Sequence, residues 1–242
     1  MFYDIHCHIL PGVDDGSRDK EESMEMAEIA VAQGILGIIT TPHHLPRSKN
    51  TSRQEVLNRI EDLNTRIEEK KLNIDLFPGM ENNITPDLHS DIKNGEALFL
   101  GDSQFILIET PFSEFTQDAK DSVLNCLENK ITPILAHPER NTDLQINRSG
   151  LSSLVRKGVL VQVNTGSFMG HYGEEAQRLA FELLHANLIH FVATDAHSSS
   201  GKRTPNMRDC FEIIKREVNE STAWKLTRDN PISILKNEKV KK

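Results

Sequence analysis

The segment DIHCHILPGVDDG, residues 4–16, carries the pattern that decides the fold of this chain. An apolar run, Phe2–Cys7, ends in an H-x-H pair formed by His6 and His8. Side chains two positions apart on a strand point to the same face, so both imidazoles are expected in one site. Neutral imidazoles are common ligands of divalent cations. The segment therefore predicts a first strand that ends at a metal site.

Outward from this segment, similar apolar runs recur and alternate with helical patterns. The expected strands are Phe2–Cys7, Ile35–Thr41, Ile74–Pro78, Phe105–Ile108, Ile131–Ala136, Leu160–Val163 and Ile189–Thr194. Near-continuous apolar strands indicate burial on both faces, as in parallel sheets. Helices are expected from the capping box at 19–22 to Gly34, along the stripe Val56, Ile60, Leu63 and Ile67, and across 116–129, 150–157, 173–187 and 205–219.

This alternation predicts an α/β fold, namely a distorted seven-stranded, TIM-like (β/α)7 barrel. A barrel is favoured over an open sheet because polar residues follow every strand rather than one switch point. The whole chain, 1–242, is expected to form a single domain with a flexible basic tail at 236–242.

Composition narrows the classes of function. The chain has 28 Lys and Arg against 36 Asp and Glu, a net charge of −8. Such an acidic balance disfavours nonspecific nucleic-acid binding, which depends on phosphate neutralisation. Three irregularly spaced cysteines argue against a disulfide framework. With no signal-like or membrane-spanning apolar run, the protein is expected in the cytoplasm without membrane insertion. The sequence gives no prediction of oligomeric state.

Polar residues with metal-ligand chemistry end most of the expected strands. In chain order the strand ends carry His6 and His8, His43, Glu81, Glu109, His137, Asn164, and Asp195 with His197, and every end except that of Asn164 offers good metal ligands. The carboxyl ends of barrel strands share one rim, where active sites form. Imidazoles and carboxylates without thiolates suit Zn²⁺, Mn²⁺ or Fe²⁺. Because the donors exceed the need of one ion, two or three bridged ions are expected.

Several assignments have alternatives at this stage. His43 is favoured over the adjacent His44, which is expected nearby or at the surface. Glu81 also fits a turn cap after Pro78-Gly79, and Asp14-Asp15-Gly16 is by default a turn above the rim. The remaining histidines, His89, His171, His185 and His190, lie away from strand ends and are expected to have structural roles.

Two arginines beside the expected rim indicate an anionic substrate. Arg140 lies three residues after His137, and Arg203 follows the loop after His197. Guanidinium groups bind phosphate bidentately, so phosphate-ester cleavage is favoured. The C-x5-R spacing of Cys210 and Arg216 is rejected as a cysteine phosphatase motif, because the intervening residues are bulky, lack glycine and continue a helical pattern.

With these residues in place, the chain resembles the PHP (polymerase and histidinol phosphatase) superfamily. More narrowly, it resembles the manganese-dependent protein tyrosine phosphatases of bacterial capsular and exopolysaccharide gene clusters. The resemblance rests on residues 4–16, 41–44, 78–81, 107–109, 136–140 and 193–197, in the order of that family. H-x-H alone is weak support, whereas the ordered set is specific.

The resemblance implies the PHP fold with three divalent ions, Mn²⁺ first and Zn²⁺ or Fe²⁺ as alternatives. It assigns His6, His8, Glu109 and Asp195 to one ion, Glu109, Glu81 and His137 to the second, and Asp15, His43 and His197 to the third. Asp14 is the alternative to Asp15. Arg140 and Arg203 match the phosphate-binding arginines, although an extra loop residue leaves Lys202 as an alternative to Arg203.

The implied activity is hydrolysis of phosphotyrosine without a covalent phosphoenzyme. The implied partner is the phosphotyrosine-bearing C-terminal tail of a bacterial tyrosine kinase that regulates capsule or exopolysaccharide synthesis. Two alternatives remain at this stage. One is a small-molecule phosphatase of the same superfamily, such as one acting on histidinol phosphate, and the other is a noncatalytic metal-binding regulator.

Overall fold

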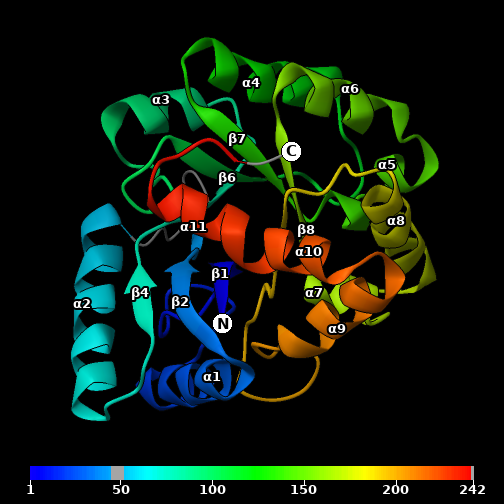
Figure 1. Cartoon of the computed structure of the whole chain (residues 1–242). Helices are drawn as coiled ribbons and strands as arrows, with labels where there is room; N and C mark the ends of the chain where they lie inside the picture. Colours follow the sequence, from blue (N-terminus) through cyan, green and yellow to red (C-terminus); the bar gives the residue numbers. More distant parts are fainter. Residues whose placement is uncertain (45–51, 241–242) are drawn as a thin grey trace.

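The computed structural model describes residues 1–44 and 52–240, and the strands in this part of the chain form two parallel sheets (Figure 1). The first sheet has the order β1-β2-β4, with β1 Phe2–Cys7, β2 Ile35–Thr40 and β4 Asp75–Phe77. The second has the order β3-β5-β6-β7-β8-β9, with β3 His43–His44, β5 Glu81–Asn83, β6 Phe105–Glu109, β7 Thr132–Ala136, β8 Leu160–Asn164 and β9 Phe191–Ala193. The predicted α/β class with parallel pairing is confirmed.

The predicted seven-stranded barrel is not confirmed. The second and third expected strands form as β2 and β4 in the first sheet, but each is followed, after Pro42 and after Pro78-Gly79, by a further short strand that belongs to the second sheet. Proline has no N–H to donate, so a continuous ladder ends at such a position. On the other side an isolated bridge between Cys7 and Ala196 joins β1 to the segment after β9. Strand pairing among the described residues does not close into a ring.

The two helices with the strongest sequence signals form as predicted. Helix α1, Lys20–Gln33, begins after Asp19, whose side chain accepts a hydrogen bond from the Glu22 amide, and it ends at Gly34 with a φ of 88°. Helix α2, Arg53–Glu69, buries the predicted stripe of Val56, Ile60, Leu63 and Ile67.

Four further predicted helices form, each somewhat shorter than its expected range or shifted by a residue. They are α4 (Gln117–Glu128), α6 (Ser149–Lys157), α8 (Glu174–His185) and α9 (Arg208–Glu217). The sequence did not indicate the short elements α3 (Leu88–Asn94), η1 (Pro138–Arg140), α5 (Thr142–Ile146), α7 (Thr165–Phe168), α10 (Glu220–Trp224), η2 (Lys225–Asp229) and α11 (Asn230–Leu235).

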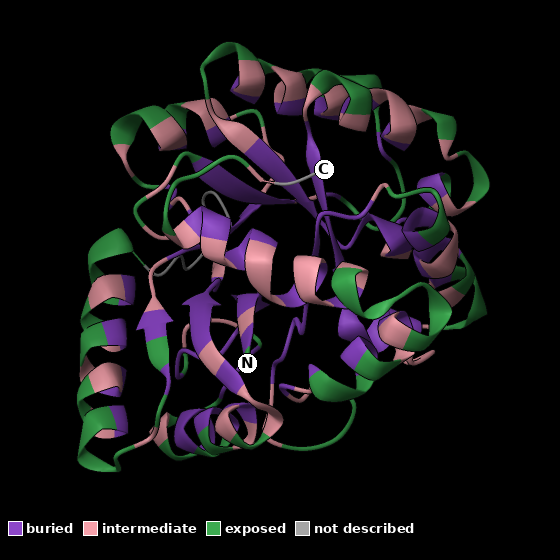
Figure 2. Ribbon diagram, in the orientation of Figure 1, coloured by how far each residue is buried: buried purple, intermediate pink, exposed green. Residues whose placement is uncertain are grey.

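The strands are largely buried (Figure 2), and residues from both sheets contribute to one apolar cluster. On β6, Phe105 and Leu107 belong to this cluster, and Glu109 is the next residue on the same face. Phe191 and Ala193 of β9 also belong to it and are followed at the same spacing by Asp195. On this face, each of the two strands therefore has apolar residues in its middle and a polar residue at its carboxyl end.

The C-terminal segment covers the opposite, amino-terminal ends of the strands. In Figure 1, α10 and α11 run across the front of the molecule. The Asn230 side chain donates to the carbonyl of His190, just before β9, and Asn237 accepts from the amide of Gln104, just before β6. Val240 packs against the shared apolar cluster. Residues 241–242, the end of the predicted flexible tail, lie outside the described residues.

Within the described residues, no helix combines the length and the apolar character that crossing a lipid bilayer requires.

Candidate metal centre

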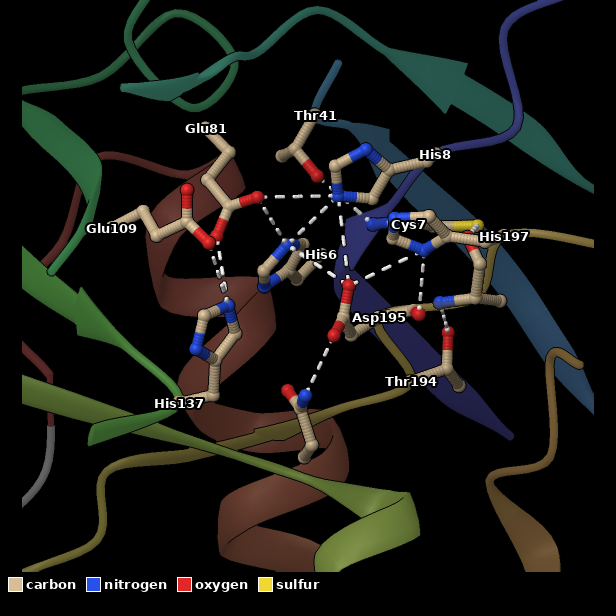
Figure 3. A network of polar contacts seen from close by, with 12 residues as sticks. His6, Cys7, His8, Thr41, Glu81, Glu109, His137, Thr194, Asp195 and His197 are labelled. Carbon is tan, nitrogen blue, oxygen red and sulfur yellow. Dashed lines mark hydrogen bonds and ion pairs between the residues drawn. The ribbon is translucent and has the colours of Figure 1, made fainter. Parts of the chain in front are cut away.

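Two imidazoles and two carboxylates meet at the centre of the polar layer (Figure 3). The Nε2 atoms of His6 and His8 lie 3.1 Å apart. Oε2 of Glu81 lies 3.2 Å from the first and 3.3 Å from the second of these nitrogens. Oδ1 of Asp195 lies 3.5 and 3.6 Å from the same two atoms. All four side chains are buried, so one compact set of nitrogen and oxygen donors occupies the interior.

A second set of donors extends from this centre toward solvent. Nδ1 of His43 lies 3.2 Å from Glu81 Oε2, and its Nε2 lies 3.5 Å from Asp15 Oδ1. Nε2 of His197 lies 3.4 Å from the same Asp15 oxygen. Asp15 is 64% exposed, whereas the histidines are largely covered. The outer set is therefore open on the side of Asp15.

Glu109 and His137 complete the cluster beside Glu81. His137 Nε2 lies 2.9 Å from Glu81 Oε1 and 3.7 Å from Glu109 Oε1. Glu81 thus contacts the imidazoles of His6, His8, His43 and His137 and is the central carboxylate of the cluster. The resemblance implied Glu109 in that position. All nine predicted ligands nevertheless converge, and three donor groups can be distinguished: His8, Asp15, His43 and His197; His6, His8 and Glu81; and His43, Glu81 and Glu109.

Hydrogen bonds at the second ring nitrogens orient three of the histidines. Nδ1 of His8 donates to Asp14 Oδ2 at 2.7 Å. Nδ1 of His6 donates to the Gln162 side-chain oxygen at 2.9 Å, and Nδ1 of His197 donates to the Asp195 carbonyl at 2.9 Å. Each bond holds a proton on Nδ1, so that Nε2, which faces the cluster, is the nitrogen that a neutral imidazole can offer to a cation. Metal-binding histidines are held in this way in proteins.

The same contacts separate the roles of the two neighbouring aspartates. Asp14 uses both carboxylate oxygens within the protein, because it also accepts from the amides of Gly16 at 2.9 Å and His43 at 3.0 Å. Asp15 instead directs its carboxylate toward His43 and His197. Of the two alternatives, Asp15 is the one that lies among the donors, and Asp14 supports His8.

The electrostatics of the cluster favour added positive charge. Burial lowers the pKa of His8, but Asp14 and Glu81 outweigh burial and hold it well above its usual value. Burial, followed by the charge of Glu81, raises the pKa of Glu109. Burial lowers the pKa of His197, as does the positive charge of His8. Carboxylates thus crowd together and are balanced by imidazolium protons, which a divalent cation displaces when it binds.

Two buried donor atoms test whether these residues fit a metal. Glu81 Oε2 and His43 Nδ1 are buried and lie 3.2 Å apart, yet among the described residues neither makes a hydrogen bond of acceptable geometry. Leaving such atoms unpaired is costly in a protein interior. A divalent cation held by these residues would satisfy both atoms, and a donor set made only of nitrogen and oxygen suits Mn²⁺, Fe²⁺ or Zn²⁺. The residues therefore fit a divalent metal.

Both predicted arginines reach the rim of the cluster from opposite sides of Asp195. Arg140 Nη1 lies 3.0 Å from Asp195 Oδ2, and Arg203 Nη2 lies 3.1 Å from Oδ1. Arg203 also donates to His197 Nε2 at 2.8 Å. The neighbouring Lys202 does not join these contacts but lines a cavity of about 460 Å³ beside Asp15, His197 and Arg203. Of the two basic alternatives, Arg203 is the one at the cluster.

Strained backbone and a buried carboxylate position the ligand loops. His137 and Asp195 have φ values of 32° and 50°, a region that costs non-glycine residues about 1–3 kcal/mol each. Asp4 accepts from the Thr194 amide at 3.0 Å and from its hydroxyl, and so joins β1 to the loop that carries Asp195. Burial raises the pKa of Asp4 to about 6. The cluster is held in place by connections that span the chain.

The other histidines lie outside the cluster, as predicted. His44 is buried next to Asp91, and His185 pairs with Glu217 on the surface. His171 contacts the backbone of Lys202, while His89 and His190 contact other backbone groups.

Several residues at the site were not identified from the sequence. One of them is Gln162, which lies on the same face of β8 as Asn164, a strand-end residue that the sequence did indicate. Asn164 Nδ2 donates to Asp195 Oδ2 at 2.7 Å. Two polar residues at alternate positions of a buried strand were the available signal. Phe112 and Tyr172, whose rings both contact the Arg140 guanidinium, had no such signal.

Residues 2–236 match the protein family described as capsular polysaccharide synthesis, CpsB/CapC. This chain belongs to that family. The tyrosine-protein phosphatase YwqE of Bacillus subtilis is 35% identical over 98% of this chain and 92% of its own length. The putative tyrosine-protein phosphatase CapC of Staphylococcus aureus is 34% identical over 82% of this chain and 78% of its own.

A solved structure gives the same result at the level of the fold. It comes from a study of YwqE from Bacillus subtilis and CpsB from Streptococcus pneumoniae, described as unique metal-dependent tyrosine phosphatases. Its TM-score is 0.94 at 35% identity, and the match covers 99% of this chain and 96% of the other. The resemblance to capsular tyrosine phosphatases predicted from the sequence is thereby confirmed.

Proposed function

We propose that this chain is a metal-dependent protein-tyrosine phosphatase. The observation that carries the proposal is the convergence of seven imidazole and carboxylate donors, which His137 and Asp195 contact directly, beside two arginines at the carboxyl ends of the strands. Membership of a family whose relatives are named tyrosine-protein phosphatases supports the same activity.

The donors divide most simply among three divalent cations, with Mn²⁺ as the proposed metal. His6, His8 and Asp195 would hold one ion. Glu109 and His137 would hold the second, with Glu81 shared between these two ions. His43, His197 and Asp15 would hold the third. The distances between donor atoms in each set support this division, as do the unpaired atoms of Glu81 and His43.

Divalent cations at these positions supply Lewis acidity toward phosphoryl oxygens and lower the pKa of water. Side chains of the protein bind and orient the phosphoryl group. Arg140 and Arg203 bind the phosphoryl oxygens and stabilise the charge that spreads over them in the transition state. The leaving group is a phenolate whose conjugate acid has a pKa of about 10, so departure needs little protonation.

The proposed substrate is phosphotyrosine on the C-terminal tail of a bacterial tyrosine kinase, encountered in the cytoplasm. Asp15 is more than half exposed and adjoins an open cavity, so the outer donors are accessible to an extended segment. A disordered tail suits such a site because no folded surface has to match the rim.

The test is turnover of one peptide in three forms, bearing phosphotyrosine, phosphoserine or no phosphate, together with histidinol phosphate. Protein stripped by a chelator should be inactive and should regain phosphotyrosine hydrolysis with Mn²⁺. His6→Ala should abolish turnover, whereas His185→Ala, which alters an exposed histidine, should not. Preference for histidinol phosphate would indicate a small-molecule phosphatase, and metal binding without turnover would indicate a regulator. Either outcome would refute the proposal.

A further inference from the structure

Phe112 is an exposed aromatic residue that lies directly against the site. It follows β6 by three residues and is 47% exposed. Its ring stacks on the imidazole of His137, with centroids 5.7 Å apart and planes 15° apart. The guanidinium carbon of Arg140 lies 4.7 Å from the same ring centroid. One aromatic side chain therefore contacts both a candidate metal ligand and a candidate phosphate-binding group.

Isolated exposed apolar residues are ordinary on protein surfaces and by themselves indicate nothing. Phe112 differs because its neighbours belong to the site and its backbone is fixed. Its carbonyl accepts from the Thr142 amide at 2.8 Å, and the adjacent carbonyl of Pro111 accepts from the Asn141 side chain at 2.5 Å. The loop is tied to η1 and α5, so the exposed ring is held at the rim.

Arg140 lies against two aromatic rings of unequal exposure, the exposed ring of Phe112 and the partly buried ring of Tyr172. The guanidinium carbon lies 4.2 Å from the Tyr172 ring centroid. Tyr172 packs so closely on Gly166 that a β-carbon there would lie 2.8 Å from the Tyr172 ring. Tyr172 therefore supports Arg140 from the protein side, while Phe112 keeps almost half of its surface in solvent.

We propose that Phe112 forms an aryl-binding subsite on which the phenyl ring of the phosphotyrosine side chain stacks. This inference rests on the proposed phosphatase function. A phosphoryl group held by Arg140 places its ester oxygen beside Phe112, and in an aryl phosphate the ring is attached directly to that oxygen. The side chain of a phosphoserine has no ring to occupy the subsite. Phe112 thus contributes selectivity for aryl over alkyl phosphates.

Binding of two non-hydrolysable probes to the manganese-loaded protein tests this subsite. Phenylphosphonate and methylphosphonate share the anionic group and differ in the ring. Stacked aromatic pairs are worth about 0.5–1.5 kcal/mol, so calorimetry should show phenylphosphonate binding about threefold to tenfold more tightly. Phe112→Leu should remove this preference and leave methylphosphonate affinity unchanged. Phe112→Tyr should retain it, as should Ile146→Ala, which trims an exposed apolar residue of α5.

Three results would overturn the inference. The wild-type protein could bind both probes equally, Phe112→Leu could keep the preference, or Phe112→Leu could weaken both probes by the same factor. The last result would mean that Phe112 acts only by placing Arg140. Failure of the proposed function is separate, since it appears as no hydrolysis of phosphotyrosine peptides by the metal-loaded protein, whereas phosphonate binding needs no turnover.

Discussion

Replacing Asp14 with asparagine should weaken metal binding although Asp14 is not among the proposed ligands. The Asp14 carboxylate accepts three hydrogen bonds, from His8 Nδ1 and from the amides of Gly16 and His43. An amide of the same shape presents one oxygen instead of two. If that oxygen faces His8, the new NH₂ group opposes the Gly16 amide. If it faces Gly16, the NH₂ group forces a proton onto His8 Nε2, which is the atom aimed at the metal.

The magnitude follows from the bonds that are lost. A hydrogen bond to a charged group contributes about 1.5–3 kcal/mol, and each 1.4 kcal/mol is a factor of ten in affinity. Loss of a partner that orients a metal-binding histidine typically costs about 10- to 100-fold. We therefore expect Asp14→Asn to bind Mn²⁺ about 10- to 100-fold more weakly, with activity partly restored by excess Mn²⁺.

Calorimetric titration of Mn²⁺ into chelator-treated protein measures this change, and circular dichroism verifies that the variant is folded. Asp62→Asn is the matched control, because it removes the same charge from an exposed pair with Lys20 on the outer helices. Wild-type Mn²⁺ affinity in Asp14→Asn would refute the view that Asp14 fixes the ring of His8.

Three further predictions address the cations and the cysteines. Asp15→Asn should lower both the number of bound Mn²⁺ ions, measured by elemental analysis, and the activity; unchanged stoichiometry would remove Asp15 from the ligand set. Mn²⁺ at about 100 times its Kd should stabilise the fold by about 2.7 kcal/mol and raise Tm by about 5–10 °C in a thermal melt. A Tm that does not respond to Mn²⁺ would contradict a cluster built for cations. Cys210→Ala should retain wild-type turnover of aryl phosphates, because Cys210 is a buried residue of α9 and burial raises the pKa of its thiol. Loss of turnover in a folded variant would instead support a cysteine-dependent mechanism.

The sequence predicted the site better than it predicted the sheet. Donors at strand ends could be identified because each follows a long apolar run, and parallel strands bring their carboxyl ends together. Helix α2 could be identified because Val56, Ile60, Leu63 and Ile67 repeat at helical spacing. Strands β3 and β5, of two and three residues, are too short to carry any periodic signal. Their membership of the second sheet depends on neighbours far away in the sequence.

The choice between Asp14 and Asp15 also depended on tertiary contacts. Both lie in one turn, and their residue types are identical. In the structure this turn packs against β1 so closely that a β-carbon on Gly16 would lie 2.2 Å from the carbonyl oxygen of His8. That packing turns Asp14 inward to His8 and leaves Asp15 at the open side. This packing of the turn against the end of the preceding strand is not encoded in the residue types of the turn, which are the same at both positions.

The two interruptions that are incompatible with a continuous barrel also place Glu81, the central carboxylate, beside its partner residues. At Pro42 and at Pro78-Gly79 the chain leaves the first sheet and joins the second, and His43 then pairs in register with Glu81. Neighbouring residues of parallel strands project side by side, which explains the 3.2 Å contact between His43 Nδ1 and Glu81 Oε2. A β-carbon at Gly79 would lie 2.8 Å from Ile39 and 3.0 Å from the carbonyl of Thr40, so the crossing requires glycine. If the strand ran straight from β4, Glu81 would continue along the first sheet, away from His137. The strand pairing is therefore interrupted next to the candidate metal ligands, and the interruption allows His43 and Glu81 to face the same cluster.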